Sequence, residues 1–278
     1  MHDYPAGPVL IQLIFNADDF GFTHDVNEGI VEAHRTGVLT ATTLMANGDA
    51  FDDAVRRARE VPSLDIGIHL VFVQGRSVLH PQKAFPETLQ ELAKALLRSE
   101  IHAYDEAAAQ VRKIIAAGIQ PSHLDTHKHT HLFPPVLDAV ARIAKEFDIP
   151  WVRRPFDYGT GPVAGLTKQA VGAAMKLMSP RFAKKLAGFR MTDHFTGFQL
   201  TGTLDTSGMI DTLKTLPAGL TEFMCHPGHC GDELRAAVTR LKETRPAELA
   251  ALTSAEVRRV IKERGIELTS YRALNARA

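Results

Sequence analysis

Four short stretches of this sequence carry carboxylate and imidazole side chains of the kinds that bind metals and move protons. Asp18 and Asp19 come directly after an apolar run, and His69 lies near the end of a second apolar run. The stretch 123–131 is rich in histidine, and His226 stands before a Pro-Gly pair. Each stretch falls where an expected strand ends, which is the rim at which α/β barrels bind ligands and catalyse reactions. We therefore expect the four stretches to meet in one site.

The histidine-rich stretch places a potential metal ligand at every second position. These residues are His123, Asp125, His127, His129 and His131. On an extended chain alternate side chains share a face, so the spacing predicts one row of five. Zinc-type metals accept neutral imidazole and carboxylate ligands, which favours a metal site over a solvated histidine-rich loop. One ion cannot bind all five, so some of them must orient ligands or contact substrate.

The other polar residues each allow more than one role. Successive strand residues point to opposite faces, so Asp18 and Asp19 need not do the same work, and a strand-end turn with Asp19 as a helix cap is the alternative. His69 is either a ligand or a satisfied core histidine. His226 is either a general acid fixed by the Pro-Gly turn or a structural turn residue. Arg154 could hold substrate, pair with a site carboxylate or form a plain salt bridge.

Short apolar strands alternate with amphipathic helices along the chain. The expected strands are Val9–Phe15, Leu39–Ala46, Asp65–Phe72, Ser122–His127, Trp151–Arg154 and Leu220–Cys225. The expected helices cover 25–35, 51–59, two segments between 86 and 117, and 134–147, with further helix starts at Pro246 and Ser254. This alternation predicts a single α/β domain over 1–278, a (β/α) barrel related to the TIM fold that is either regular or distorted and incomplete. An open doubly wound sheet is the competing architecture, and no glycine-rich nucleotide-binding sequence supports it.

The segment 158–192 has an unusual composition for such a barrel. It contains no acidic residue but several basic ones, and apolar residues recur at helical spacing from Leu166 to Leu177. Ser179-Pro180 divides it into two expected helices. We interpret it as a helical insertion with two alternative roles. It either consists of ordinary core helices or forms a basic lid at the barrel mouth, in which 164–190 touches an anionic membrane.

Composition and leader signals limit the location and the partners. Lys+Arg and Asp+Glu both number 32, so no net field attracts nucleic acid, and we expect none as a partner. The apolar run Val9–Phe15 is too short and lacks the basic flank of a signal peptide, and no stretch is long enough to cross a bilayer. Cys225 and Cys230 are expected as reduced thiols rather than as a disulfide or metal ligands. We expect a cytoplasmic protein, peripheral at the inner membrane surface if the insertion contacts lipid.

Several of these stretches together resemble the YdjC-like carbohydrate deacetylases. The resemblance rests on NADDFG (Asn16–Gly21), VNEGIVEAHRTGVLTATTLMANG (Val26–Gly48), IGIHL (Ile66–Leu70), PSHLDTHKHTHLFP (Pro121–Pro134), TEFMCHPG (Thr221–Gly228) and RPAELAALTS (Arg245–Ser254). It covers nearly the whole chain in order. Within that family, the run Phe51–Gly75 is most similar to the members associated with hopanoid biosynthesis.

The resemblance implies a metal-dependent deacetylase that acts on an N-acetylglucosamine-type sugar. The subgroup implies the N-acetylglucosaminyl headgroup of a hopanoid lipid as substrate. The implied ligands of one divalent metal ion are Asp19, His69 and His127, with Asp18 as catalytic base and His226 as catalytic acid. Zn²⁺ is the favoured ion for this ligand set, while Mg²⁺, Ni²⁺ and Co²⁺ are compatible with it.

Four further residues are implied to contact substrate or to orient the ligands, namely Asp125, His129, His131 and Arg154. Three other functions stay open. A chitooligosaccharide deacetylase would use the same residues on a free sugar. A non-catalytic protein that binds a sugar or lipid headgroup through a metal would not need Asp18 and His226 together. A glycoside hydrolase would need two opposed carboxylates and no metal.

Overall fold

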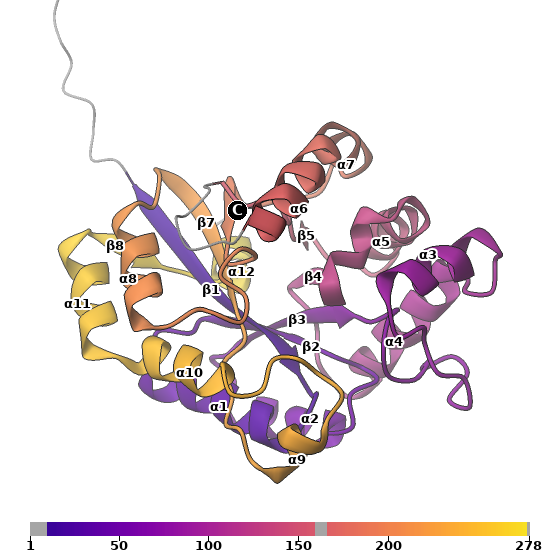
Figure 1. Ribbon diagram of the computed structural model, residues 1–278, viewed down its shortest axis with the longest axis horizontal. Coiled ribbons are helices and arrows are strands. Elements are labelled where there is room, and N and C mark those ends of the chain that lie inside the picture. Colours follow the sequence, from indigo (N-terminus) through magenta and orange to yellow (C-terminus); the bar gives the residue numbers. More distant parts are fainter. Residues whose placement is uncertain (1–9, 159–165, 277–278) are drawn as a thin grey trace, which may run out of the picture.

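A curved parallel sheet runs through the centre of the molecule (Figure 1). The computed structural model describes residues 10–158 and 166–276. Within them the strands are β1 (Ile11–Phe20), β2 (Ala41–Leu44), β3 (Asp65–Leu70), β4 (His123–Thr126), β5 (Trp151–Val152), β6 (His194–Thr196), β7 (Gly219–Cys225) and β8 (Ile266–Leu268). Their order is β5-β4-β3-β2-β1-β7-β6, and β8 pairs with β1. Every pairing is parallel, so the carboxyl ends of the main strands lie at one rim.

The sheet is a half-barrel rather than a closed barrel. In the described part of the chain β5 and β6 do not pair with each other, and the isolated bridges Trp151–Arg190 and Asp157–Phe195 connect the segments around them. Strands β5 and β6 are two and three residues long, so they cannot form a continuous ladder with each other. The prediction of a single α/β domain with a barrel-like parallel sheet is therefore confirmed in its incomplete form, and the regular closed barrel is wrong.

Helices flank the sheet (Figure 1). They are α1 (His24–Thr36), α2 (Phe51–Glu60), α3 (Leu89–Leu97), α4 (Ala103–Ala116), α5 (Pro134–Glu146), α6 (Leu166–Leu177), α7 (Ser179–Lys185), α8 (Thr206–Lys214), α9 (Asp232–Ala236), α10 (Arg245–Thr253), α11 (Ala255–Glu263) and α12 (Tyr271–Asn275). Helix α12 differs from the others because its Tyr271 packs inside the half-barrel. The side chain of Thr23 caps α1, so the expected cap Asp25 lies in its first turn instead. Ser254 caps α11 as its position predicts.

Alternation along β1 separates two environments. Leu13, Phe15 and Ala17 join the large core between the sheet and the helices. Ile14 belongs to a small separate cluster inside the half-barrel, made with Ala41, Trp151, Leu220 and Tyr271. Because side chains alternate, Asn16 and Asp18 follow Ile14 on this inner face. The interior is therefore apolar at the amino end of the strands and polar at the carboxyl end.

The histidine-rich stretch leaves the sheet earlier than its spacing predicts. Strand β4 ends at Thr126, and the 3-10 segment η1 (His127–Leu132) follows. Lys128 and His129 both adopt left-handed backbone angles, with φ of 52° and 53°. The prediction of one extended row from His123 to His131 is wrong, because the chain turns at the rim to enter α5.

The segment 158–192 contains the two expected helices, α6 and α7, although 159–165 lie outside the described residues. The side chains of Phe182 in α7 and of Leu186, which caps its end, are buried, and this helix contacts α5. On α6, Val171 and Leu177 are 45% and 84% exposed. Its role as lid or core stays a prediction.

None of the described helices combines the length and the hydrophobicity needed to cross a membrane.

Candidate functional site

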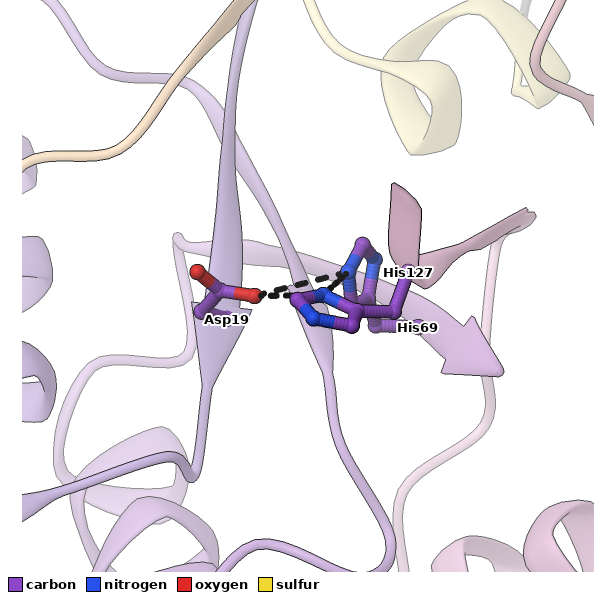
Figure 2. Close-up of side chains that lie close together, drawn as sticks. All are labelled: Asp19, His69 and His127. Atoms are coloured by element: carbon purple, nitrogen blue, oxygen red, sulfur yellow. Dashed lines mark hydrogen bonds and ion pairs between the residues drawn. The ribbon is translucent and has the colours of Figure 1, made fainter. Parts of the chain in front are cut away.

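Three of the predicted ligands meet at the carboxyl rim of the half-barrel (Figure 2). Asp19 ends β1, His69 lies in β3 and His127 begins η1. Asp19 Oδ1 is 3.2 Å from His127 Nδ1 and 3.5 Å from His69 Nε2, and these two nitrogens are 3.3 Å apart. Asp19 Oδ1 is buried and has no hydrogen-bond partner among the described residues. One carboxylate oxygen and two imidazole nitrogens that converge in this way fit a divalent ion of the zinc type.

A buried arginine holds the carboxylate of Asp19 in place. Arg245, at the start of α10, donates from Nη2 to Asp19 Oδ2 over 2.6 Å. Burial raises the pKa of Asp19, but the charge of Arg245 together with the contacts and charges of His127 and His69 outweighs burial and keeps this pKa well below its usual range. Asp19 also has a left-handed φ of 71°, which is costly for a non-glycine residue. The arginine therefore keeps the aspartate ionised and leaves Oδ1 free for a metal.

Asp125 orients the imidazole of His69. Asp125 Oδ1 lies 2.6 Å from His69 Nδ1, and the hydroxyl of Thr43 donates to Asp125 Oδ2 over 3.2 Å. With Nδ1 engaged, His69 turns Nε2 towards Asp19 and His127, as a metal ligand requires. Burial lowers the pKa of His69, but the charge and hydrogen bond of Asp125 outweigh it and raise the pKa to about 9. A metal at this position therefore competes with a proton.

Asp18 faces away from Asp19 and pairs with a different arginine. Arg153 donates from Nη1 to Asp18 Oδ2 over 2.8 Å and from Nη2 to Asp18 Oδ1 over 2.6 Å. Burial raises the pKa of Asp18, but the charge and hydrogen bonds of Arg153, together with the charges of His69 and His226, outweigh it and hold this pKa well below its usual range. Asp18 is thus an anion with fixed orientation beside the three predicted ligands.

Arg153, like Arg245, is a site residue that the sequence analysis missed. Its guanidinium also lies 2.5 Å from Asp125 Oδ2 and 2.7 Å from Glu222 Oε1, so one buried cation joins three carboxylates. The neighbouring Arg154 is placed elsewhere, and its Nη1 donates to the backbone oxygen of Asp193 over 2.7 Å. Trp151 and Arg153 are two residues apart, so on an extended chain their side chains share one face. This spacing is the sequence signal that relates Arg153 to the inside of the half-barrel.

His226 follows β7 and is buried at the same rim. Its backbone nitrogen donates to Glu248 Oε2 over 2.6 Å, and its Nδ1 lies 4.0 Å from the same oxygen. Burial lowers the pKa of His226 to about 4, although the charges of Asp18 and Asp19 oppose this shift. The ring is therefore neutral near pH 7.

His129 and His131 are buried but do not join the three ligands. His131 Nδ1 lies 2.5 Å from the hydroxyl of Thr126, and its ring packs against Phe182. The ring of His129 packs between Phe195 and Phe198, with centroid distances of 5.8 and 5.5 Å. Burial lowers the pKa of His129 well below its usual value and that of His131 to about 3. Both rings are neutral, and their surroundings are mainly aromatic.

Comparisons with known proteins identify the family of this chain. A carbohydrate deacetylase of Brevibacillus brevis is 33% identical over 271 residues, which cover 95% of this chain and 100% of that protein. A carbohydrate deacetylase of Vibrio campbellii is 31% identical, covering 95% and 96%. The crystal structure of a putative cellobiose-phosphate cleavage protein from Enterococcus faecalis V583 superposes with a TM-score of 0.76 at 26% identity, covering 95% and 99%. The pattern of the YdjC-like protein family matches residues 12–263, and the chain therefore belongs to this family.

Proposed function

We propose that this protein is a metal-dependent carbohydrate deacetylase that removes the acetyl group from an N-acetylated amino sugar. The observation that carries the proposal is the convergence of Asp19, His69 and His127 beside the ionised Asp18. The names of the similar proteins, carbohydrate deacetylases with which the chain aligns over 95% of its length, support the same reaction.

The residues of this site have the properties that amide hydrolysis needs. When bound, a divalent ion at the three ligands supplies Lewis acidity, which lowers the pKa of water and stabilises charge on the acetyl oxygen. Asp18 takes a proton from the attacking water, and Arg153 keeps it anionic and oriented for this step. His226 delivers a proton to the sugar nitrogen as the carbon–nitrogen bond breaks. Burial keeps His226 neutral in the free protein. His226 must therefore accept a proton during the reaction before it can donate one to the sugar nitrogen.

The two other classes of function fit this arrangement less well. A protein that only binds a sugar through a metal has no use for an aspartate held anionic beside the ligands. A glycoside hydrolase needs a protonated and an ionised carboxyl group on opposite sides of a bond. Here Asp18 is fixed in a bidentate contact with Arg153, and Asp19 is fixed by Arg245.

The test combines metal replacement with two variants that separate ligand from base. Protein stripped with a chelator is reloaded with Zn²⁺, Mg²⁺, Ni²⁺ or Co²⁺, and acetate release is measured from diacetylchitobiose and from an N-acetylglucosaminyl hopanoid. We expect His127→Ala to lose both bound metal and turnover. We expect Asp18→Asn to keep the metal and lose turnover by about 10²–10⁴-fold. Turnover by the stripped protein, or an active Asp18→Asn variant, would contradict the proposal.

For the substrate we propose the sugar headgroup of a membrane lipid, presented at the cytoplasmic face of the inner membrane. Helix α6 supports this, because its residues Ala170, Val171, Ala174 and Leu177 share one face by helical spacing and are exposed. Arg181 and Lys184 of α7 are exposed nearby in the sequence, whereas Lys185 pairs with Asp138. An exposed apolar face with basic neighbours suits the interface of an anionic membrane.

A matched pair of leucines tests the membrane contact. Leu177 of α6 and Leu97 of α3 are 84% and 85% exposed, so replacing either with glutamate perturbs the fold little. We expect Leu177→Glu to weaken co-sedimentation with anionic vesicles and Leu97→Glu to leave it unchanged. Equal binding by both variants and wild type would exclude the contact through α6. Acetate release from diacetylchitobiose should be the same for all three proteins.

A further inference from the structure

A buried carboxyl group that the proposed reaction does not use lies beside His226. It belongs to Glu248 of α10, which is 1% exposed. Glu248 Oε2 accepts a hydrogen bond from the backbone nitrogen of His226 over 2.6 Å, whereas His226 Nδ1 lies 4.0 Å from the same oxygen. The second distance is too long for a hydrogen bond. Glu248 therefore holds His226 by its backbone rather than by its ring.

The chain around His226 is also fixed on its other sides. His226 follows directly on β7, which pairs with β1 as far as its last residue, Cys225. The ring of Pro227 restricts the backbone after His226. Gly228 then packs against Gly29 of α1 so closely that a Cβ added to Gly29 would lie 2.5 Å from Gly228 Cα. The turn after β7 therefore lies between α1 and α10, and the N–H of His226 is its hydrogen bond to α10.

Helix α10 anchors two residues of the site. Arg245, its first residue, donates to Asp19, and Glu248, three positions later, accepts from His226. Residues three apart in a helix lie on the same face. One rigid element thus fixes the predicted ligand Asp19 and the predicted acid His226 relative to each other.

The acceptor oxygen of Glu248 is difficult to replace. His226 is buried, so without Glu248 its N–H would be left unpaired, which is costly, and the end of β7 could avoid this cost only by moving. Burial raises the pKa of Glu248 to about 7, although the N–H of His226 and the charge of Arg245 oppose this shift. Near neutral pH the carboxyl group is partly protonated, so a neutral amide is a close substitute for it.

We propose that Glu248 is a positioning residue for His226 and acts through the backbone N–H of His226. Its oxygen fixes the point at which the chain leaves β7, and with it the place from which the imidazole delivers a proton. When the carbon–nitrogen bond breaks, its electron pair goes to the sugar nitrogen, and the proton from His226 converts the leaving group into a neutral amine. A displaced ring delivers this proton poorly. This inference rests on the proposed role of His226 as the acid.

Two substitutions at Glu248 separate the hydrogen bond from the charge. Glutamine keeps an acceptor oxygen, whereas leucine fills a similar space without one. With diacetylchitobiose we expect Glu248→Gln to keep kcat within about threefold of wild type and Glu248→Leu to lose about 10–100-fold, because a misplaced catalytic group costs about this much. KM and bound metal should be unchanged in both. Equal kcat values for the two variants would overturn the proposal.

A change of leaving group shows whether the loss concerns the acid. The ester para-nitrophenyl acetate carries the same acetyl group, but its phenolate leaves without taking up a proton. We expect Glu248→Leu to hydrolyse this ester as fast as wild type, because the metal ligands and Asp18 are unchanged. An equal loss on the ester and on the sugar would mean a general disturbance of the site, and the positioning role would be wrong.

Hydrogen exchange tests the contact itself and needs no variant to be active. In protein labelled with ¹⁵N-histidine, the backbone amide of His226 is assigned by its loss in His226→Ala. We expect this amide to exchange slowly with solvent in wild type and in Glu248→Gln, because the acceptor is present in both. Rapid exchange in the wild-type protein would show that the hydrogen bond is absent and would overturn the proposal.

The His226→Ala variant, assayed in parallel, distinguishes the two proposals. If His226→Ala loses turnover of diacetylchitobiose and the two Glu248 variants are equal, only the positioning role fails. If His226→Ala is fully active on this sugar, the acid assignment fails and the positioning role fails with it.

Discussion

The two ends of the half-barrel interior are built from the same strands but hold opposite kinds of residue. At the amino end Ile14, Trp151 and Leu220 pack around Tyr271. Two or four residues further along the same strands lie Asp18, Arg153 and Glu222, which form buried ion pairs. The contrast shows that one alternating strand can supply a stabilising plug at one end and a reactive centre at the other.

The two ends differ in what they contribute to stability. Burying an aliphatic or aromatic side chain stabilises the fold by about 1.5–3 kcal/mol. Burying a charge costs several kcal/mol, and its partner offsets this cost only when the geometry is good. At the carboxyl end four buried carboxyl groups face two buried arginines, because Asp18, Asp125 and Glu222 surround Arg153 and Asp19 pairs with Arg245. The raised pKa of His69 reflects this excess of negative charge. A divalent ion would balance this excess, so the polar end is built to bind one.

The strongest test of this contrast removes the shared cation. Arg153→Met should lower the free energy of unfolding by about 3–5 kcal/mol, because three buried carboxylates lose their partner. Turnover should disappear with it, since Asp18 is no longer held. Chemical denaturation and the acetate assay measure the two effects.

The neighbouring arginine provides the control. Arg154→Met removes a donor to the backbone oxygen of Asp193 but no partner of a site carboxylate. We expect a loss of at most about 1.5 kcal/mol and nearly normal turnover. An Arg153→Met protein as stable as Arg154→Met would show that the ion cluster is not essential to the fold.

A cavity at the amino end should lower the stability of the fold without lowering the catalytic constant. Ile14 is fully buried in the apolar cluster, so Ile14→Ala should cost about 2–5 kcal/mol of stability. The catalytic constant of the folded protein should stay close to wild type, because no ligand or base touches Ile14. A large fall in kcat at temperatures where the variant is folded would mean that the two ends are not independent.

The strand-end pattern predicted that the polar stretches meet, because carboxyl ends of parallel strands lie at one rim. The choice of Asp19, His69 and His127 as ligands came from the resemblance to the YdjC-like family. The sequence predicted Arg154 rather than Arg153 because a strand of two residues carries almost no alternation. The inward position of Trp151 fixes Arg153 on the inner face, but only the structure shows which way Trp151 points.

Other differences come from tertiary contacts that a local pattern does not contain. The alternation from His123 to His131 continues in sequence, yet the strand ends at Thr126 because the chain must turn into α5. Strands β6 and β8 have three residues each and show no period of their own. The hydrogen bond between Asn16 and His123 joins residues 107 positions apart, which no local spacing can indicate.

The last and smallest effect concerns a carboxyl group that lies beyond the ion cluster. Asp157 accepts hydrogen bonds from the backbone nitrogens of Phe198 and Gln199, at 3.4 and 2.9 Å, and forms no salt bridge within the described part of the chain. Burial raises its pKa to about 6, the opposite of the shift in Asp18, which has Arg153 beside it. A raised pKa means that the folded state binds more protons than the unfolded state between pH 3.8 and about 6. Stability therefore falls as the pH rises through this window.

In Asp157→Asn this contribution to the pH dependence of stability is absent. We expect the stability of the variant relative to wild type to be higher at pH 7.5 than at pH 3.5 by about 3 kcal/mol. Urea unfolding of both proteins at the two pH values measures this difference, in which the other titrating groups cancel. An unchanged gap between the two proteins would show that Asp157 titrates normally, and the contrast with Asp18 would then not depend on the missing arginine.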